Sequence, residues 1–178
     1  MPTRSYASSL LAVTAMAIAV SVSTRAQTAP DWGALARLVG EWVADGGSGG
    51  QPGVATRGGE IWTRELDGHV LVRRDFSEYP ATATRAAFRH EGLAVFSRSP
   101  SGALRAHLDD NEGHSIDYDV AVRGDSIVLT SAKTPQLPTF RLTYEAVSSG
   151  YAVRFEMAPP DAPLEFRTYV SGAIHRVR

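Results

Sequence analysis

Residues 151–158 read YAVRFEMA, and residues 140–145 read FRLTYE. In both stretches, apolar side chains alternate with polar or small ones. Because successive side chains of a strand point to opposite faces of a sheet, each stretch predicts a strand with one apolar face. The same alternation recurs in about ten short segments from residue 40 to the C-terminus, with turn signals between them. Such a series buries its apolar faces together by closing into a barrel or by pairing as a sandwich.

The connections between these segments are short, which favours an antiparallel up-and-down order. Asp67-Gly68 is a strong hairpin signal between two of the segments. Before the first strand, Asp31 can cap a short helix that Gly40 ends, while the glycine-rich residues 45–59 predict a loop. We therefore predict an all-β fold, a single antiparallel up-and-down β-barrel of about 8–10 strands with a short N-terminal helix.

The polar faces of the predicted strands carry full charges, such as Arg141 with Glu145 and Arg154 with Glu156. Facing lipid, a basic residue near the midplane would cost about 2–4 kcal/mol. The aromatic girdles of an outer-membrane barrel also do not appear regularly. These observations favour a water-soluble barrel with its apolar face turned inward.

The N-terminus predicts a secretory signal peptide over residues 1–26. Arg4 supplies a positive start, Leu10 to Val22 form an apolar run too short for a mature anchor, and Thr24-Arg25-Ala26 offers a cleavage site. We expect the mature domain, residues 27–178, to be periplasmic or secreted, with no membrane span after cleavage. The chain has no cysteine, so the fold depends on its core and thiolate chemistry is excluded.

The charge balance argues against nucleic acid or an anionic membrane as the main partner. Removal of the signal peptide takes two of the 18 basic residues and none of the 19 acidic ones, so the mature domain is slightly acidic. We expect a small molecule as the partner, and the sequence leaves the oligomeric state open.

The stretch Gly40-Glu41-Trp42 after a short helix, followed by a meander that ends in an arginine-bearing strand, resembles the calycin-like barrels. These include lipocalins, fatty-acid-binding proteins and the ten-stranded, haem-binding nitrobindin-like proteins. The segments from Glu91-Gly92 to Gly124-Asp125 are also similar to secreted bacterial barrels of this kind. The resemblance implies a ligand inside the barrel. In such a barrel Gly40 would let the chain bend under the floor, Trp42 would plug the closed end, and Arg167 or Arg176 could stack on its indole.

Strand parity suggests which side chains would contact that ligand. Arg74 lies between Val72 and Phe76 in phase with apolar residues, so it would need a carboxylate partner such as Glu65, an anionic ligand, or an exposed position at the strand end. His90 shares a face with Phe88 and could bind a polar head. The predicted ligand-binding residues are Arg74, Phe88, His90, Tyr118, Phe140, Phe155 and Met157.

The function that follows is an exported, soluble barrel that binds a small apolar or amphipathic ligand in its interior, and a binding protein is favoured over an enzyme. Two alternatives stay open: a haem-binding or enzymatic barrel that uses His90 or His175, and a filled structural barrel without a ligand. We assign no catalytic residue, no metal ligand and no cofactor other than this haem alternative. The acidic turn 109–113 fails the EF-hand spacing, and residues 46–50 match G-x-S-x-G without the helix that its mechanism needs.

Overall fold

The computed structural model describes residues 28–44, 48–49 and 55–177. The predicted signal peptide, residues 1–26, lies outside these residues, as does most of the G-x-S-x-G match. Eleven strands follow a 3-10 helix, η1 (Gly33–Leu38), and a second short 3-10 helix, η2 (Leu66–Gly68), joins two of them. The strands are β1 (Gly40–Ala44), β2 (Ser48–Gly49), β3 (Arg57–Glu65), β4 (Val70–Tyr79), β5 (Phe88–Arg98), β6 (Leu104–Asp110), β7 (Ser115–Arg123), β8 (Ser126–Ser131), β9 (Thr139–Val147), β10 (Gly150–Ala158) and β11 (Arg167–Arg176).

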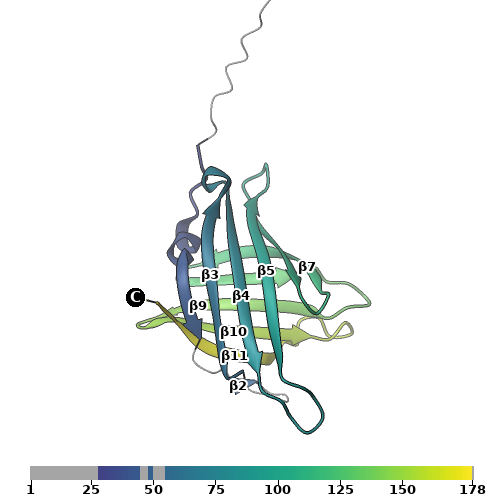
Figure 1. Cartoon of the computed structure of the whole chain (residues 1–178). Coiled ribbons are helices and arrows are strands. Elements are labelled where there is room, and N and C mark those ends of the chain that lie inside the picture. Colours follow the sequence, from purple (N-terminus) through teal and green to yellow (C-terminus); the bar gives the residue numbers. More distant parts are fainter. Residues whose placement is uncertain (1–27, 45–47, 50–54, 178) are drawn as a thin grey trace, which may run out of the picture.

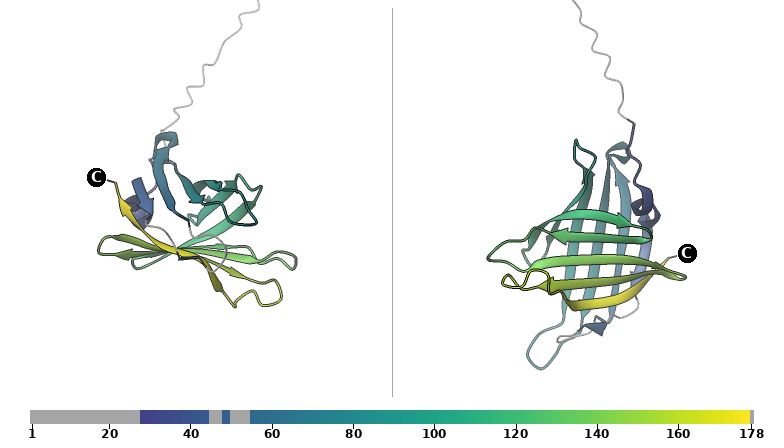
Figure 2. Two further views of the ribbon diagram at one scale, coloured as in Figure 1. Left: turned by 60° about the horizontal axis from the view of Figure 1, so that its bottom comes forward. Right: turned by 180° about the vertical axis from the view of Figure 1, so that it is seen from behind.

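The sheet closes on itself. Each strand from β3 to β11 pairs antiparallel with the next, and β1 pairs with both β3 and β11, placing Trp42 opposite Glu60 on one side and Arg176 on the other. The two-residue β2 adds a short pairing to β11. The structure is therefore a closed antiparallel barrel of ten strands, as the alternation predicted. Figures 1 and 2 show it flattened into two layers whose strands cross steeply, with β3–β5 in one layer and β8–β11 in the other.

The N-terminal helix and one loop boundary differ from the prediction. The predicted short helix is only the six-residue 3-10 helix η1, whose N-cap is Trp32 and not Asp31; the Asp31 carboxylate accepts a hydrogen bond from the Gly33 amide at 2.9 Å. The predicted loop 45–59 ends early, since β3 begins at Arg57. Gly58 and Gly59 pair with β1 and are buried, so sheet pairing overrides their loop-forming tendency.

One end of the barrel, which we call the closed end, is filled by side chains of η1 and the strands above it. The indole of Trp32 donates to the Gly68 carbonyl at 2.8 Å, and that of Trp42 donates to the Leu38 carbonyl at 2.6 Å. Leu35 and Leu38 are fully buried. The buried apolar side chains that form this core include Trp32, Leu35, Leu38, Trp42, Trp62, Leu71, Phe96, Ile127, Leu129 and Tyr144.

The opposite end, which we call the open end, is bordered by the connections 80–87, 111–114, 132–138 and 159–166. Interior-facing side chains there are only partly buried, among them Ser77, Tyr79, Phe88, His90 and Phe155. The interior thus changes along the barrel axis from a packed floor to a partly exposed mouth.

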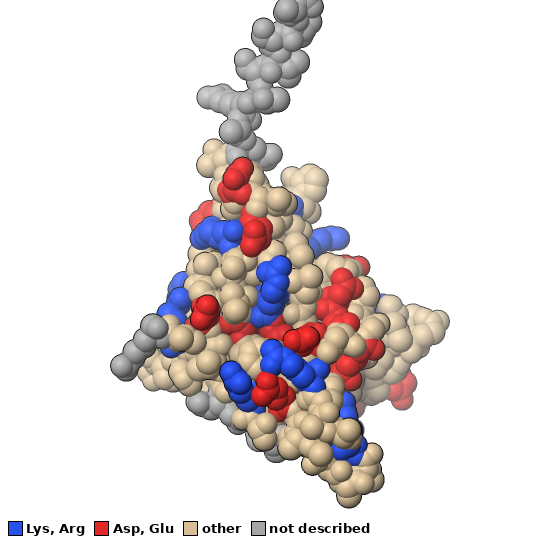
Figure 3. Space-filling model, in the orientation of Figure 1, with Lys and Arg blue, Asp and Glu red and all other residues tan. Residues whose placement is uncertain are grey.

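The outer surface carries charges of both signs. Figure 3 shows acidic and basic side chains interspersed over the face formed by β3–β5. On this face Arg89 contacts Glu78 at 2.6 Å and Glu91 at 2.9 Å. In the described part of the chain, no helix has the length and apolar character needed to cross a bilayer.

Candidate functional site

A group of charged and polar side chains lies inside the barrel, between the packed floor and the open end. β3 contributes Glu60 and Trp62, and β4 contributes Arg73 and Asp75. Register places Trp62 opposite Arg73 and Glu60 opposite Asp75, so the four side chains come from one antiparallel pair and face the interior together. Tyr144 reaches them from β9. We call Glu60, Trp62, Arg73, Asp75 and Tyr144 the interior cluster.

A continuous chain of polar contacts joins four members of this cluster. Nη2 of Arg73 lies 2.7 Å from Oδ1 of Asp75, and Nη1 donates to the Tyr144 hydroxyl at 2.8 Å. The Tyr144 hydroxyl in turn donates to Oε2 of Glu60 at 2.8 Å. Glu60, Arg73 and Tyr144 are almost completely buried, so these charge-assisted contacts act in a low-dielectric environment that strengthens them.

Burial shifts the protonation equilibria of the cluster. Desolvation raises the pKa of Glu60 to about 7, and the opposing charge of Arg73 limits the rise. Burial also raises the pKa of Tyr144 well above its ordinary value, so the phenol stays protonated and can donate. Burial by itself lowers the pKa of Arg73, but Asp75, Tyr144 and Glu60 together outweigh it, so the pKa of the guanidinium is raised. Arg73 is therefore charged at every ordinary pH, whereas Glu60 can exchange a proton near neutrality.

Several buried atoms of the cluster have no hydrogen-bond partner of good geometry within the protein. They are Oε1 of Glu60, Nε1 of Trp62, Nε of Arg73 and Oδ1 of Asp75. The Trp62 N–H lies near enough to Glu60 to lower its pKa, but the two atoms are not aligned as a hydrogen bond. Oδ1 of Asp75 has only the ion pair with Arg73. An unpaired buried polar group costs about 1–3 kcal/mol, so unpaired donors and acceptors gathered in one place mark a candidate site.

Aromatic side chains gather near the open end. Tyr79 stacks on Phe88 with ring centroids 5.0 Å apart, and Phe140 stacks on Phe155 at 5.7 Å. Tyr169 packs its edge against Phe155 at 6.2 Å. A hollow of about 370 Å³ opens at this end, lined by Pro138, Met157, Ala158, Pro159, Pro160, Arg167, Thr168 and Tyr169. The open end thus offers apolar surface on the solvent side of the polar interior cluster.

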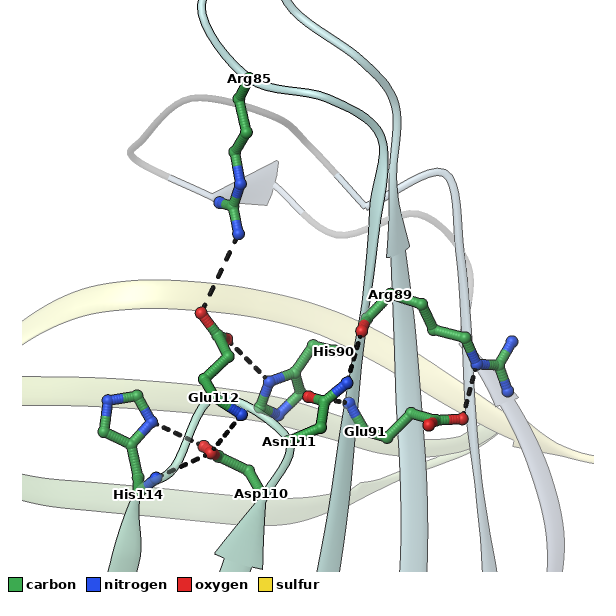
Figure 4. A network of polar contacts seen from close by, with 8 residues as sticks. All are labelled: Arg85, Arg89, His90, Glu91, Asp110, Asn111, Glu112 and His114. Atoms are coloured by element: carbon green, nitrogen blue, oxygen red, sulfur yellow. Dashed lines mark hydrogen bonds and ion pairs between the residues drawn. The ribbon is translucent and has the colours of Figure 1, made fainter.

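A second polar network lies on the rim of the open end, where the β6–β7 turn meets β5 (Figure 4). Nδ1 of His90 lies 3.0 Å from Oε1 of Glu112, whose other oxygen is 3.9 Å from Arg85. Arg85 also stacks on the Phe88 ring, with 3.6 Å between its guanidinium carbon and the ring centroid. These contacts join the connection 80–87 to the β6–β7 turn.

The same turn is fixed internally by Asp110. Its carboxylate accepts hydrogen bonds from the amides of Glu112 and His114, both at 2.9 Å, and contacts the His114 ring at 2.7 Å (Figure 4). These hydrogen bonds lower the pKa of Asp110 although partial burial opposes them. Among the described residues, no group of three His, Asp or Glu side chains is arranged to hold a metal ion. The Asp110 carboxylate therefore holds the backbone of its own turn.

The structure corrects the placement of the predicted arginine. Arg74 lies on the outer face of β4 and is exposed, and its neighbour Arg73 is the interior residue. The interior phase of β4 is Leu71, Arg73 and Asp75, because these residues pair with the inward side chains of β3 and β5. The sequence predicted instead that Val72, Arg74 and Phe76 face the interior, because Phe76 is a large apolar residue.

The other predicted ligand contacts lie on interior-facing positions of their strands. Phe88, Phe140, Phe155 and Met157 are partly buried near the open end, and His90 lies on the rim with its ring held by Glu112. Tyr118 is deeper and almost fully buried, where burial raises its pKa to about 12. Of these residues, Tyr118 is close enough to Arg73 and Asp75 for their charges to affect its pKa.

The structural residues predicted at the closed end are placed as follows. Trp42 is buried, and the guanidinium of Arg176 lies 4.6 Å from its ring centroid while donating to the carbonyls of Val39 and Arg37. Arg167 lies at the other end of β11, beside the hollow at the mouth, so of the two candidates Arg176 is the one that stacks. Gly40 has φ of +130°, and a Cβ there would collide with the Arg176 guanidinium.

His175, the second histidine considered for haem, lies opposite Val43, between the interior-facing Ile174 and the Trp42-stacked Arg176. Strand alternation therefore directs it to the outer face. An imidazole at that position does not reach the barrel interior.

Sequence reasoning missed Glu60, Arg73, Asp75 and Tyr144. One usable signal was present: Trp62 and Leu71 are large apolar residues on either side of the Asp67-Gly68 turn. Placing both inside fixes the phase of both strands and brings Glu60 and Arg73 inside with them. The contact with Tyr144 spans 84 residues and has no local signal.

Neither a protein-family model nor a curated protein matches the chain. Solved structures do match it, among them the crystal structure of Rv2717c from M. tuberculosis. The two chains superpose with a TM-score of 0.56 and 16% sequence identity, and the match covers 82% of this chain and 96% of that one. At this identity the likeness shows the fold alone, and that shared fold is the β-barrel.

Proposed function

We propose that this chain is an exported calycin-like barrel that binds a small amphipathic molecule in its interior. The polar end of the ligand lies against the interior cluster, and its apolar part extends past Phe140 and Phe155 towards the open end. Apolar walls with a few directed polar groups are the general composition of small-molecule sites. The sequence of residues 1–26 supports export, and the ten-stranded closed barrel supports the calycin-like resemblance.

The observation that carries this proposal is the set of unpaired polar atoms inside the barrel. A barrel filled only for stability is expected to satisfy its buried polar groups or to replace them with apolar side chains. Here Glu60, Trp62 and Arg73 each keep a buried polar atom without a hydrogen bond, and Oδ1 of Asp75 has only its ion pair with Arg73. Asp75 is still partly accessible, with 22% of its side chain exposed, so the cluster is in contact with the open end.

Native mass spectrometry tests this function directly. The protein is expressed with its own N-terminus, purified without detergent, and weighed before and after denaturation. We expect an additional small-molecule mass on the native wild-type protein and on Arg74→Met, and a smaller fraction of protein that carries this mass in Glu60→Gln. Circular dichroism verifies that both variants are folded. A bare native mass of the wild-type protein would contradict the proposal, and an uncleaved N-terminus would contradict export.

A filled structural barrel is the second candidate, and the packing of the closed end favours it. Trp62 contacts Phe96 at a centroid distance of 4.7 Å and Tyr144 at 5.9 Å, which fills the interior on that side of the cluster. This candidate predicts that the wild-type protein and both variants carry no additional small-molecule mass.

A further inference from the structure

The interior cluster contains more negative than positive charge. Arg73 is its one cation, and it faces two carboxylates, those of Asp75 and Glu60. Asp75 neutralises the guanidinium through the 2.7 Å ion pair. The cluster is therefore neutral when Glu60 is protonated and carries one negative charge when Glu60 is ionised. This differs from a site in which an uncompensated arginine grips a carboxylate.

An anionic ligand head would add charge of the same sign to this buried space. Burying an unpaired charge is expensive, and a third carboxylate would have no free cation to pair with. A head that donates hydrogen bonds meets the opposite situation, because Oε1 of Glu60 is a buried acceptor without a hydrogen bond, and Oδ1 of Asp75 has only its ion pair with Arg73. A hydroxyl could in addition accept from the unpaired Trp62 N–H.

The position of Asp75 is fixed by the residue opposite it. Gly92 of β5 pairs with Asp75, and a Cβ at this glycine would lie 2.8 Å from Oδ1 and 3.1 Å from Oδ2. The absence of a side chain at Gly92 thus makes room for the carboxylate over the β5 backbone. This space holds the acceptor beside Arg73 and below the mouth.

From this geometry we infer that the polar end of the bound molecule is a hydrogen-bond donor, an amine or a hydroxyl, and not a carboxylate. The inference rests on the proposed function and specifies its ligand class. The charged and titratable groups around Glu60 are Arg73 and Asp75 from β4 and Tyr144 from β9. Arg73 keeps its charge near neutral pH, and Tyr144 stays protonated, so Glu60 is the group that exchanges a proton there. A cationic head is therefore held more tightly as Glu60 ionises.

The test uses three probes that share one alkyl chain: decylamine, decanol and decanoate. Each is titrated into the mature protein, residues 27–178, by isothermal calorimetry at about pH 6 and about pH 8. Each probe is kept below its micelle concentration or solubility limit. We expect decylamine and decanol to bind at least about tenfold more tightly than decanoate, as the loss of a charged hydrogen bond implies. We also expect decylamine affinity to increase with pH.

Two variants separate the site from general apolar binding. Glu60→Gln should weaken decylamine about tenfold and remove its pH dependence, while leaving decanoate unchanged or tighter. Glu91→Gln, an exposed outer-face carboxylate, should leave all three affinities unchanged. If Glu60→Gln does not fold, the order of the three affinities for the wild-type protein still tests whether the site prefers a donor head to a carboxylate.

The possible failures are distinguishable. Preference for decanoate would overturn the donor-head inference and leave the binding function standing. Failure of all three probes, together with a bare native mass, would overturn the proposed function and the inference with it. A pH dependence that persists in Glu60→Gln would overturn the role of Glu60.

Discussion

The two ends of the barrel are built on one sheet but differ in what their interior side chains do. At the closed end, Trp32 and Trp42 are buried among apolar side chains, and their indole N–H groups donate to backbone carbonyls. At the open end, Phe88 and His90 are partly exposed. The closed end therefore supplies most of the apolar burial that stabilises the fold.

The interior cluster lies at the boundary between these two regions. Glu60, Arg73 and Tyr144 are buried like the side chains of the closed end, whereas Asp75 is partly exposed towards the mouth. Buried charges contribute little net stability even when paired, and removal of one partner is strongly destabilising. The difference between the two ends thus separates residues that stabilise the barrel from residues that would contact the ligand under the proposed function.

Removal of the closed-end indole should produce the largest loss of stability. Trp42→Ala deletes the edge contact with Tyr151 at 5.3 Å, the Arg176 stacking and the hydrogen bond to Leu38. We expect the free energy of unfolding in urea to fall by about 3–5 kcal/mol. The neighbouring Val43→Ala, on the outer face, is the control and should change it by less than about 0.5 kcal/mol. A loss below about 1 kcal/mol for Trp42→Ala would show that the closed end does not carry the fold.

The adjacent arginines of β4 give a sharper comparison. Arg73→Met leaves Glu60 and Asp75 without their buried cation, so we expect a loss of about 3 kcal/mol at neutral pH and a smaller loss in mild acid, where Glu60 is protonated. Arg74→Met, one residue away on the outer face, should change stability by less than about 0.5 kcal/mol. Chemical unfolding of both variants measures the difference. Equal effects would mean that the interior phase of β4 is wrong.

The pH dependence of stability tests the burial of Glu60. Its pKa is raised from 4.5 to about 7 in the folded protein, so the folded state binds this proton more tightly than the unfolded state. The resulting stability is present below the unfolded pKa and is lost as the pH rises through about 7. Between about pH 5 and about pH 8, the wild-type protein should lose about 2 kcal/mol relative to Glu60→Gln. A difference that stays constant over this window would place Glu60 in solvent.

The rim network should have the smallest effect on stability. Glu112→Gln removes the contacts to His90 and Arg85, but Glu112 and Arg85 are well exposed, and exposed ion pairs contribute about 0–1 kcal/mol. We expect a loss below about 1 kcal/mol in thermal or urea unfolding, comparable to that of Glu91→Gln. A loss as large as that of Arg73→Met would mean that the open end is as important for the fold as the closed end.

Alternation and turn signals were sufficient to predict the barrel, the first strand, the Asp67-Gly68 hairpin and the interior-facing positions of Phe88, His90 and Phe155. They failed in β4 because both phases of that strand contain apolar residues. Phe76 looked internal, yet it lies outside beneath Arg89 and Arg57, whose guanidinium carbons are 3.9 and 5.7 Å from its ring centroid. Cation–π contacts of this kind let an aromatic ring occupy an outer face.

The interior cluster could not be read from the sequence for a second reason. Its contacts join β3, β4 and β9, and the hydrogen bond from Tyr144 to Glu60 depends on the way the sheet closes. The identity of the arginine that stacks on Trp42 was undecided for the same reason. Arg167 and Arg176 lie at opposite ends of β11, and only the pairing of β1 with β11 brings Arg176 to the closed end.

The most direct test of the division between the two ends is an NMR titration of the isotope-labelled mature protein with decylamine. We predict that the amide shifts change for Glu60, Arg73 and Asp75 and for residues lining the open end, while those of η1 and Trp42 stay in place. Changes confined to the closed end or to the outer face, with the cluster unaffected, would contradict the account.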